Sequence, residues 1–199
     1  MLGVLSYVIC TMTLQWLVFL ALMLSPLGEI AEGSKLLWSP ERKLTWNDLR
    51  GTPDKASPFA ALTRIDMSIM QGPHATANTM ELIVSAELVP EGSWVIPDKK
   101  TPVILAHEQG HFDIAEYHAR RLRKALEEHG PFRARTLDRD VNAIFDRIFR
   151  EKDNMQLAYD RQTGHSIHLG PQLEWEARIV QLLDSLDAYG GRGVTITLR

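Results

Sequence analysis

The sequence predicts an α+β fold, in which a small antiparallel sheet is followed by a helical part. Residues 59–70 and 79–89 have the apolar and β-branched content of strands. Residues 101–129, 135–161 and 171–188 have the apolar periodicity and end signals of helices. With 199 residues, of which 45% are hydrophobic and 24% charged, the chain has the composition of an ordinary globular domain.

The two predicted strands should form a hairpin. Residues 79–89 alternate, with Leu82 and Val84 on one face and Glu81 on the other. Residues 71–78, QGPHATAN, would be the connecting loop, where His74 would be solvated. We expect the strand over residues 79–89 to line a cleft and to pair with an extended peptide. Residues 194–198, VTITL, are predicted to form a last strand.

The N-terminal segment from Leu2 to Leu27 carries no charged residue and is long enough to cross a bilayer as a helix. We therefore predict a signal peptide or N-terminal membrane anchor at residues 1–27, a connector at residues 28–35 and a single domain at residues 36–199. That domain would lie outside the cytoplasm, in the periplasm or secreted, either free or tethered to the inner membrane by residues 2–27.

Charge and cysteine content exclude several classes of function. The net charge of −3 and the absence of a basic cluster argue against nucleic acid as a partner. Cys10 is the single cysteine, so the chain forms no intramolecular disulfide and no thiolate zinc finger. A metal site would therefore use histidine, aspartate or glutamate. The sequence leaves the oligomeric state open.

The stretch HEQGH, residues 107–111, has the spacing of a zinc-hydrolase motif. Residues four apart lie on one face of a helix, which lets His107 and His111 converge on one Zn²⁺. Glu108 lies about 100° around the helix from His107, where it can act as general base toward a water whose pKa zinc lowers to about 7.

The helical pattern around the motif predicts that the two histidines face inward. Ile104, His107, His111, Ala115, His118 and Leu122 form one stripe, and the opposite, solvated face would hold Asp113, Glu116, Arg120, Arg123, Lys124 and Glu127. Buried histidines beside a carboxylate are costly without a partner, and a cation is the simplest one. Gly110 would fit a close approach by substrate or by a neighbouring strand.

The third metal ligand must come from elsewhere in the chain. His118 lies about 10 Å along the unbroken helix from His111, beyond the reach of a shared metal, and is expected to be a packing or surface residue. His129, at the predicted helix end, is expected to act as a cap. The downstream segment 158–179 offers His165, which we favour, with His168, Glu174 and Glu176 as alternatives.

Other residues near these candidates could have supporting roles. Asp113 and Asp160 are candidates to accept the second ring N–H of a ligand histidine, although both could equally be solvated helix charges. Tyr159 is a candidate to stabilise an oxyanion, although a tyrosine near a helix end more often serves packing.

Several pieces of the chain resemble a bacterial family of uncharacterised proteins described as predicted secreted zinc-dependent proteases (domain of unknown function 922). The similarity covers roughly residues 36–185, and Ser166 stands where the family pattern is expected to have glycine. It implies a zincin-like hydrolase in which His165 is the third zinc ligand. The matching residues are 42–53, 60–63, Ser93, Trp94, 107–116, Tyr159, Asp160, Thr163, His165, Gln172 and Trp175.

Taken together, these features predict a zinc-dependent metallohydrolase, a peptidase acting on a peptide or protein outside the cytoplasm. His107, His111 and His165 would bind Zn²⁺, and Glu108 would be the base. The alternative is a non-catalytic envelope module of the same fold that binds a peptide, a cell-wall component or a partner protein. Hydrolysis of an amide other than a peptide bond is a third possibility that the motif leaves open.

Overall fold

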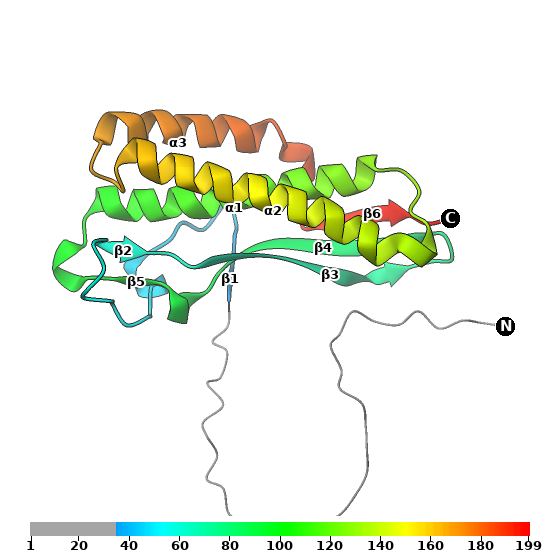
Figure 1. The fold of residues 1–199 in the computed structure, drawn as a ribbon, viewed down its shortest axis with the longest axis horizontal. Helices are drawn as coiled ribbons and strands as arrows, with labels where there is room; N and C mark the ends of the chain where they lie inside the picture. Colours follow the sequence, from blue (N-terminus) through cyan, green and yellow to red (C-terminus); the bar gives the residue numbers. More distant parts are fainter. Residues whose placement is uncertain (1–34) are drawn as a thin grey trace, which may run out of the picture. The chain divides into compact units, whose positions relative to one another are not determined.

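Residues 35–199 fold as three α-helices packed on a small antiparallel sheet, the predicted α+β arrangement (Figure 1). The structure, a computed structural model, describes residues 35–199. The predicted signal peptide or anchor at residues 1–27 and nearly all of the connector lie outside these residues. None of the helices within residues 35–199 combines the length and the hydropathy of a membrane span.

Strand β4 (Thr79–Leu88) is the central strand of the main sheet. The long strand β3 (Ile65–Ala75) pairs with one edge of β4, and the two form the predicted hairpin. The short strands β1 (Leu36–Leu37) and β6 (Gly193–Thr197) share the other edge, β1 at the Leu88 end and β6 at the Thr79 end. Because both edges of β4 are paired, the expectation that this strand binds an extended peptide is wrong.

The predicted strand over residues 59–70 is divided between two sheets. Strand β2 (Ala61–Leu62) pairs with β5 (Trp94–Val95), and β3 begins only at Ile65. The division follows from the pairing of Arg64, whose N–H donates to Ser93 Oγ and whose carbonyl accepts from Val89 N. Strand β3 then runs on to Ala75 through an irregularity, so His74 lies in a strand instead of the loop, and it is exposed.

The three helices lie close to their predicted positions: α1 is Pro102–Glu128, α2 is Leu137–Thr163 and α3 is Leu169–Asp184. Thr101 caps α1 by accepting the N–H of Ile104. Helix α1 packs on the sheet, and α2 and α3 pack on α1 and on each other (Figure 1). The main core lies between these layers and includes Val84, Leu88, Phe112, Ala115, Ala119, Leu122, Leu126, Ile148 and Ile196.

Helix α1 is buried on more sides than its hydrophobic stripe indicates. Asp113, Glu116, Arg120 and Arg123, which were predicted to be solvated, are all buried. Glu116 accepts from Arg120 Nε at 3.1 Å and from Arg123 Nη1 at 3.0 Å, and Arg123 also donates to the carbonyl of Val84. Because their charges are paired and hydrogen-bonded, these side chains can be buried between the sheet and α3. Glu127, by contrast, is exposed as predicted.

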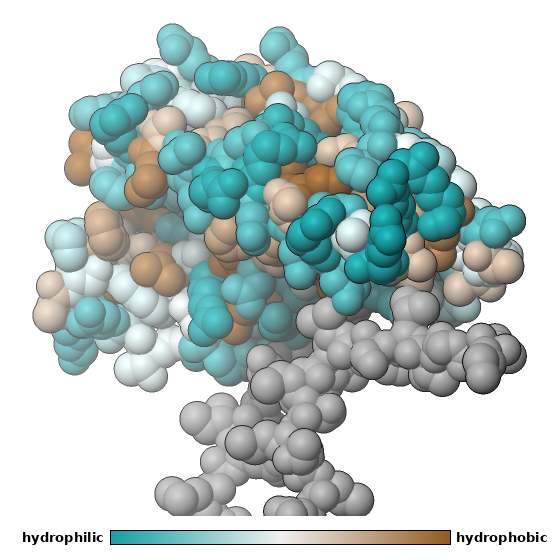
Figure 2. Space-filling view, turned by 45° about the vertical axis from the view of Figure 1, so that its right-hand side comes forward, coloured by the Kyte–Doolittle hydropathy of each residue, from teal (hydrophilic) through white to brown (hydrophobic). Residues whose placement is uncertain are grey.

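The surface of the described residues carries both hydrophilic and hydrophobic side chains. Figure 2 shows a face on which hydrophilic side chains surround smaller hydrophobic areas. Exposed large apolar side chains include Leu169, Leu173 and Val180 on α3 and Leu157 on α2.

Candidate metal centre

Helix α1 brings its two motif histidines together in the interior. The Nε2 atoms of His107 and His111 lie 3.2 Å apart, as expected for residues one turn apart on one helix face. His107 is buried and His111 is half-buried. The Nδ1 atom of His107 has no hydrogen-bond partner among residues 35–199, so the polar contacts of its ring run through Nε2.

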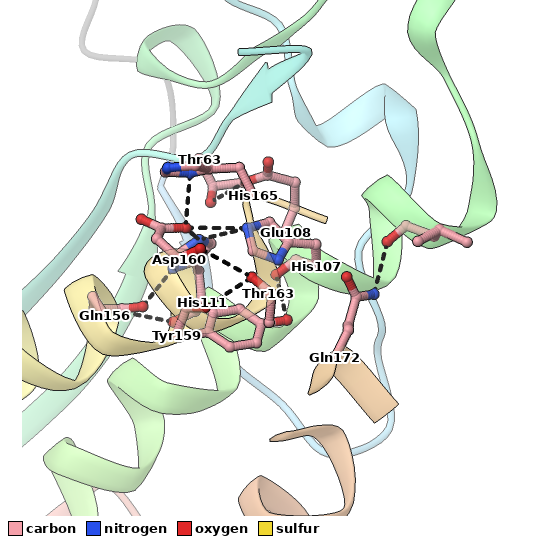
Figure 3. Close-up of polar contacts among 11 residues, drawn as sticks. Thr63, His107, Glu108, His111, Gln156, Tyr159, Asp160, Thr163, His165 and Gln172 are labelled. Carbon is pink, nitrogen blue, oxygen red and sulfur yellow. Dashed lines mark hydrogen bonds and ion pairs between the residues drawn. The ribbon is translucent and has the colours of Figure 1, made fainter. Parts of the chain in front are cut away.

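The end of α2 carries the third histidine into the same place. Gly164, His165 and Ser166 all have positive φ, at 57°, 52° and 73°, so the chain turns sharply after Thr163. The N–H of His165 donates to the carbonyl of Asp160 at 3.0 Å, which fixes this turn against the last turn of the helix. As a result, His165 Nδ1 lies 3.3 Å from Asp160 Oδ1 (Figure 3).

Asp160 lies at the centre of the three histidines. Its Oδ1 atom is 3.2 Å from His107 Nε2 and 2.9 Å from His111 Nε2, in addition to its contact with His165 (Figure 3). His107, Asp160 and His165 offer atoms that all lie within 4.8 Å of one another, a group that could hold a metal ion. Asp160 was predicted only as an acceptor for a ring N–H, so its central position is a finding of the structure.

The donor set and its spacing fit zinc. Imidazole nitrogen and carboxylate oxygen are zinc ligands, and ligands at about 2.0–2.1 Å in tetrahedral geometry lie roughly 3.3 Å from one another. The three contacts that link His107, His111 and Asp160 measure 2.9–3.2 Å. These atoms therefore lie at the separations that ligands of one zinc ion would have.

The alternative third ligands lie elsewhere. The Nδ1 atom of His168 is 3.3 Å from the carbonyl of Gln162, and Glu176 accepts a hydrogen bond from Gln172. Glu174 is exposed on α3. His118 is buried, with its Nδ1 bonded to the carbonyl of Ile114, and His129 is the C-cap residue of α1, both as predicted.

Gln156, one turn before Asp160 on α2, orients His111. Its Nε2 donates to the carbonyl of His111 at 2.9 Å, which leaves its Oε1 to accept from His111 Nδ1. The proton of a neutral His111 is thereby held on Nδ1, and the lone pair of Nε2 points toward Asp160. Gln156 was not among the residues predicted from the sequence, although its i, i+4 spacing to Asp160 was an available signal.

Tyr159 and Asp113 have structural roles. The Tyr159 ring stacks on His107 with centroids 4.6 Å apart, and its hydroxyl donates to the carbonyl of His107. This close approach requires Gly110, so the neighbour of that glycine is a helix side chain and not a strand. Asp113 accepts from Trp38 Nε1 and Gln109 Nε2, each at 2.7 Å, and not from either motif histidine.

The charges of the site influence one another. Burial opposes ionisation of Asp160, but the contacts with His107 and His111 outweigh it and hold the pKa of this carboxyl below its usual range. Burial also opposes a charge on His111, yet Asp160 and the charge of Glu108 raise its pKa above the ordinary value. The site is therefore electrostatically suited to a positive charge.

Glu108 is buried beside these residues, in a pocket of about 270 Å³. The hydroxyl of Thr63 donates to its Oε2 at 2.7 Å (Figure 3). Thr63 belongs to the segment between β2 and β3, which forms one wall of the pocket. No role of this segment in the site was predicted from the sequence. The pocket is lined by residues 59–63, Ile65, Ile104, His107, Glu108, His111, Lys152, Gln156, Asp160, His165 and Ser166.

Comparison with known proteins supports a family but assigns no activity. No curated protein and no solved structure matches the chain. Residues 92–166, from just before β5 through α1 to the turn after α2, match the model of a family described as a bacterial protein of unknown function (DUF922). The matched region contains all four residues around the candidate metal centre, and the match supports the family resemblance drawn from the sequence.

Proposed function

We propose that this protein is a zincin-like, zinc-dependent hydrolase, a peptidase that acts outside the cytoplasm. The observation that carries the proposal is that ring nitrogens of His107, His111 and His165 all lie within 3.3 Å of Asp160 Oδ1, beside the buried carboxylate of Glu108 in a pocket. Two histidines of α1 and one from the turn after α2 supply the ligands that zinc prefers, and the carboxylate next to them supplies a base.

His107, His111 and His165 would hold the zinc ion. When bound, zinc would polarise a substrate carbonyl and make a water molecule acidic enough to be deprotonated near neutral pH. Gln156 supports this role by keeping the lone pair of His111 Nε2 directed at the site.

Glu108 would accept the proton of the attacking water and deliver it to the nitrogen of the leaving amine. The Thr63 hydroxyl holds one oxygen of Glu108, so the other oxygen is free to act as the base. Since Glu108 is buried, its carboxylate has few competing water contacts and keeps a fixed orientation.

We propose a peptide substrate for two reasons: the residues that form the pocket wall, and the resemblance of HEQGH to the motif of zinc peptidases. Residues 59–63 line the pocket, and Phe59, Leu62 and Thr63 give this wall both apolar and polar groups, which suits a peptide with apolar side chains. The uncharged segment Leu2–Leu27 supports a site of action outside the cytoplasm. Hydrolysis of another amide would use the same groups.

A second candidate is a metal-stabilised module that binds a peptide or partner protein without cutting it. The observation that favours it is Asp160, which adds a fourth donor atom to the three histidines. A zinc ion with four protein ligands is typical of structural sites, whereas catalytic sites keep one position open.

The deciding experiment compares full-length wild type with Glu108→Gln and with Glu127→Gln, the same substitution at an exposed position of α1. Each protein is purified in detergent, assayed for zinc, and incubated with a peptide library read by mass spectrometry. The hydrolase proposal expects equal zinc in all three, with cleavage by wild type and Glu127→Gln and none by Glu108→Gln.

Two results would contradict the proposal. Absence of zinc from wild type would remove the metal centre. Zinc with no cleavage in any of the three would favour the binding module. A His165→Ala variant tests the third ligand separately, because it should bind less zinc than wild type, and equal zinc would exclude His165.

A further inference from the structure

Asp160 offers one oxygen atom to all three candidate zinc ligands. Its Oδ1 contacts His107 Nε2, His111 Nε2 and His165 Nδ1 at 2.9–3.3 Å. A carboxylate that only orients a ligand histidine usually bonds to the ring nitrogen that faces away from the metal. Here Oδ1 faces the same Nε2 atoms of His107 and His111 that point toward each other.

The orientation of His111 makes this contact informative. Gln156 accepts from Nδ1 of His111, so a neutral ring presents the lone pair of Nε2 to Asp160 Oδ1 at 2.9 Å. The Nε2 atoms of His107 and His111 lie 3.2 Å from each other, and Asp160 Oδ1 lies within 3.2 Å of both. Two ring nitrogens and a carboxylate oxygen that converge in this way have the arrangement of ligands around one cation.

The backbone fixes Asp160 in this position. Its carbonyl accepts the N–H of His165 and lies in the last turn of α2, where Tyr159 packs against His107. Asp160 and His165 therefore approach the site as one rigid turn.

We propose that Asp160 is a direct fourth ligand of the metal, so that the resting site is closed by the protein's own carboxylate and opens only when Asp160 is displaced. This inference rests on the metal centre of the proposed function. Four protein ligands leave no position on the metal for a water molecule, and without that water Glu108 has no proton to accept. Displacement of Asp160 would free the fourth position for water, so a closed resting site is compatible with Glu108 as the general base.

The first test asks whether residue 160 touches the metal. In full-length protein carrying Cys10→Ser, which removes the only native cysteine, Asp160→Cys is loaded with Co²⁺. A thiolate bound to cobalt gives a near-ultraviolet charge-transfer band, which an unbound thiol lacks. The band is expected for Asp160→Cys and not for the control Asp146→Cys, which lies at an exposed position of the same helix. Asp160→Ala is the second variant, because the cysteine side chain is shorter than that of aspartate.

The second test asks whether Asp160 blocks a ligand position. Co²⁺-loaded wild type, Asp160→Ala and Asp146→Ala, an exposed aspartate on the same helix, are titrated with acetohydroxamic acid and followed by visible absorption. If the site is open for only about a tenth of the time, Asp160→Ala should bind the hydroxamate roughly tenfold more tightly than wild type and Asp146→Ala. Its cobalt spectrum before titration should also differ from that of wild type.

The outcomes separate this inference from the proposed function. Wild type that binds neither Co²⁺ nor Zn²⁺ overturns both. Wild type that binds metal, together with an Asp160→Ala variant of unchanged spectrum and unchanged or weaker hydroxamate affinity, overturns only the fourth ligand. In that case Asp160 is a positioning residue, and the hydrolase proposal stands on its own assay.

Discussion

The hydroxyl of Tyr159 occupies the space that a side chain on Gly110 would need. A Cβ added to Gly110 would lie 2.4 Å from Tyr159 Oη and 2.7 Å from its Cζ. Glycine in the middle of α1 thus allows the Tyr159 ring of α2 to stack on His107. The contact holds this part of α2 against α1, so that Asp160 and His165 lie beside the motif histidines.

Gly110→Ala should therefore destabilise the protein. Overpacking costs about 1–3 kcal/mol, against a gain of about 1 kcal/mol that alanine brings to a helix interior, so we expect a net loss of up to about 2 kcal/mol. Urea unfolding followed by circular dichroism measures the difference. The control is Gly170→Ala in α3, where the added Cβ meets nothing within 4 Å apart from its chain neighbours and its own helix backbone, and stability should rise by up to about 1 kcal/mol.

The cause is tested by adding Tyr159→Phe to Gly110→Ala. Phenylalanine lacks the hydroxyl, so the double variant should lose less stability than the sum of the two single variants. If Gly110→Ala is as stabilising as Gly170→Ala, Tyr159 does not restrict this position.

Gln156→Leu should weaken zinc binding without preventing the fold. Leucine neither accepts from His111 Nδ1 nor donates to its carbonyl, so the ring loses the contacts that orient it. Loss of such supporting contacts typically lowers metal affinity by about 10- to 100-fold. Competition with a chromophoric chelator measures the affinity. Gln181→Leu, at an exposed position of α3, should match wild type, and an equal affinity in both variants would show that Gln156 does not support the site.

Local periodicity accounts for the parts that the sequence predicted well. The three helices and the inward face of His107 follow from apolar spacing within each segment. The turn that carries His165 was predicted because the helical pattern ends near residue 161, and the structure ends α2 at Thr163. The sequence also offered a reason to reject His118, because an unbroken helix separates it from His111.

Contacts between distant segments account for the rest. Asp160 was considered only as a supporting residue, because its place among the histidines depends on how α2 packs on α1. The break between β2 and β3 is set by pairing with residues near Ser93. The charged side of α1 was misassigned because hydrophobic periodicity cannot show that Glu116 and Arg123 neutralise each other inside the protein.

Ser166→Gly should stabilise the turn after α2. Ser166 has φ of 73°, a left-handed conformation that costs a non-glycine residue about 1–2 kcal/mol, and it stands where the family pattern is expected to have glycine. The greater freedom of glycine in the unfolded chain offsets part of the gain, so we expect about 0.5 kcal/mol. Ser185→Gly, at φ of −62°, should instead destabilise in the same urea unfolding assay. Equal effects of the two substitutions would show that the turn holds no such strain.

His118 should make stability fall as the solution becomes acidic. Its side chain is 1% exposed, and burial is the largest of the effects that lower its pKa from 6.5 to about 4. The Ile114 carbonyl and Glu151 favour the charged ring, whereas Arg121 and Lys152 disfavour it. Between these two pKa values the unfolded chain binds a proton that the folded protein does not, so acid favours unfolding.

The resulting loss is about 3 kcal/mol between pH 6.5 and pH 4, since one pKa unit corresponds to about 1.4 kcal/mol. Urea unfolding at half-unit pH steps measures it for wild type, His118→Gln and His129→Gln. His118→Gln should be less stable than wild type at pH 7.5, because it disturbs a packed site, but should show a flatter pH dependence below 6.5. His129→Gln, at the exposed end of α1, should keep the wild-type slope. If the slopes of wild type and His118→Gln coincide, another group is responsible for the acid sensitivity.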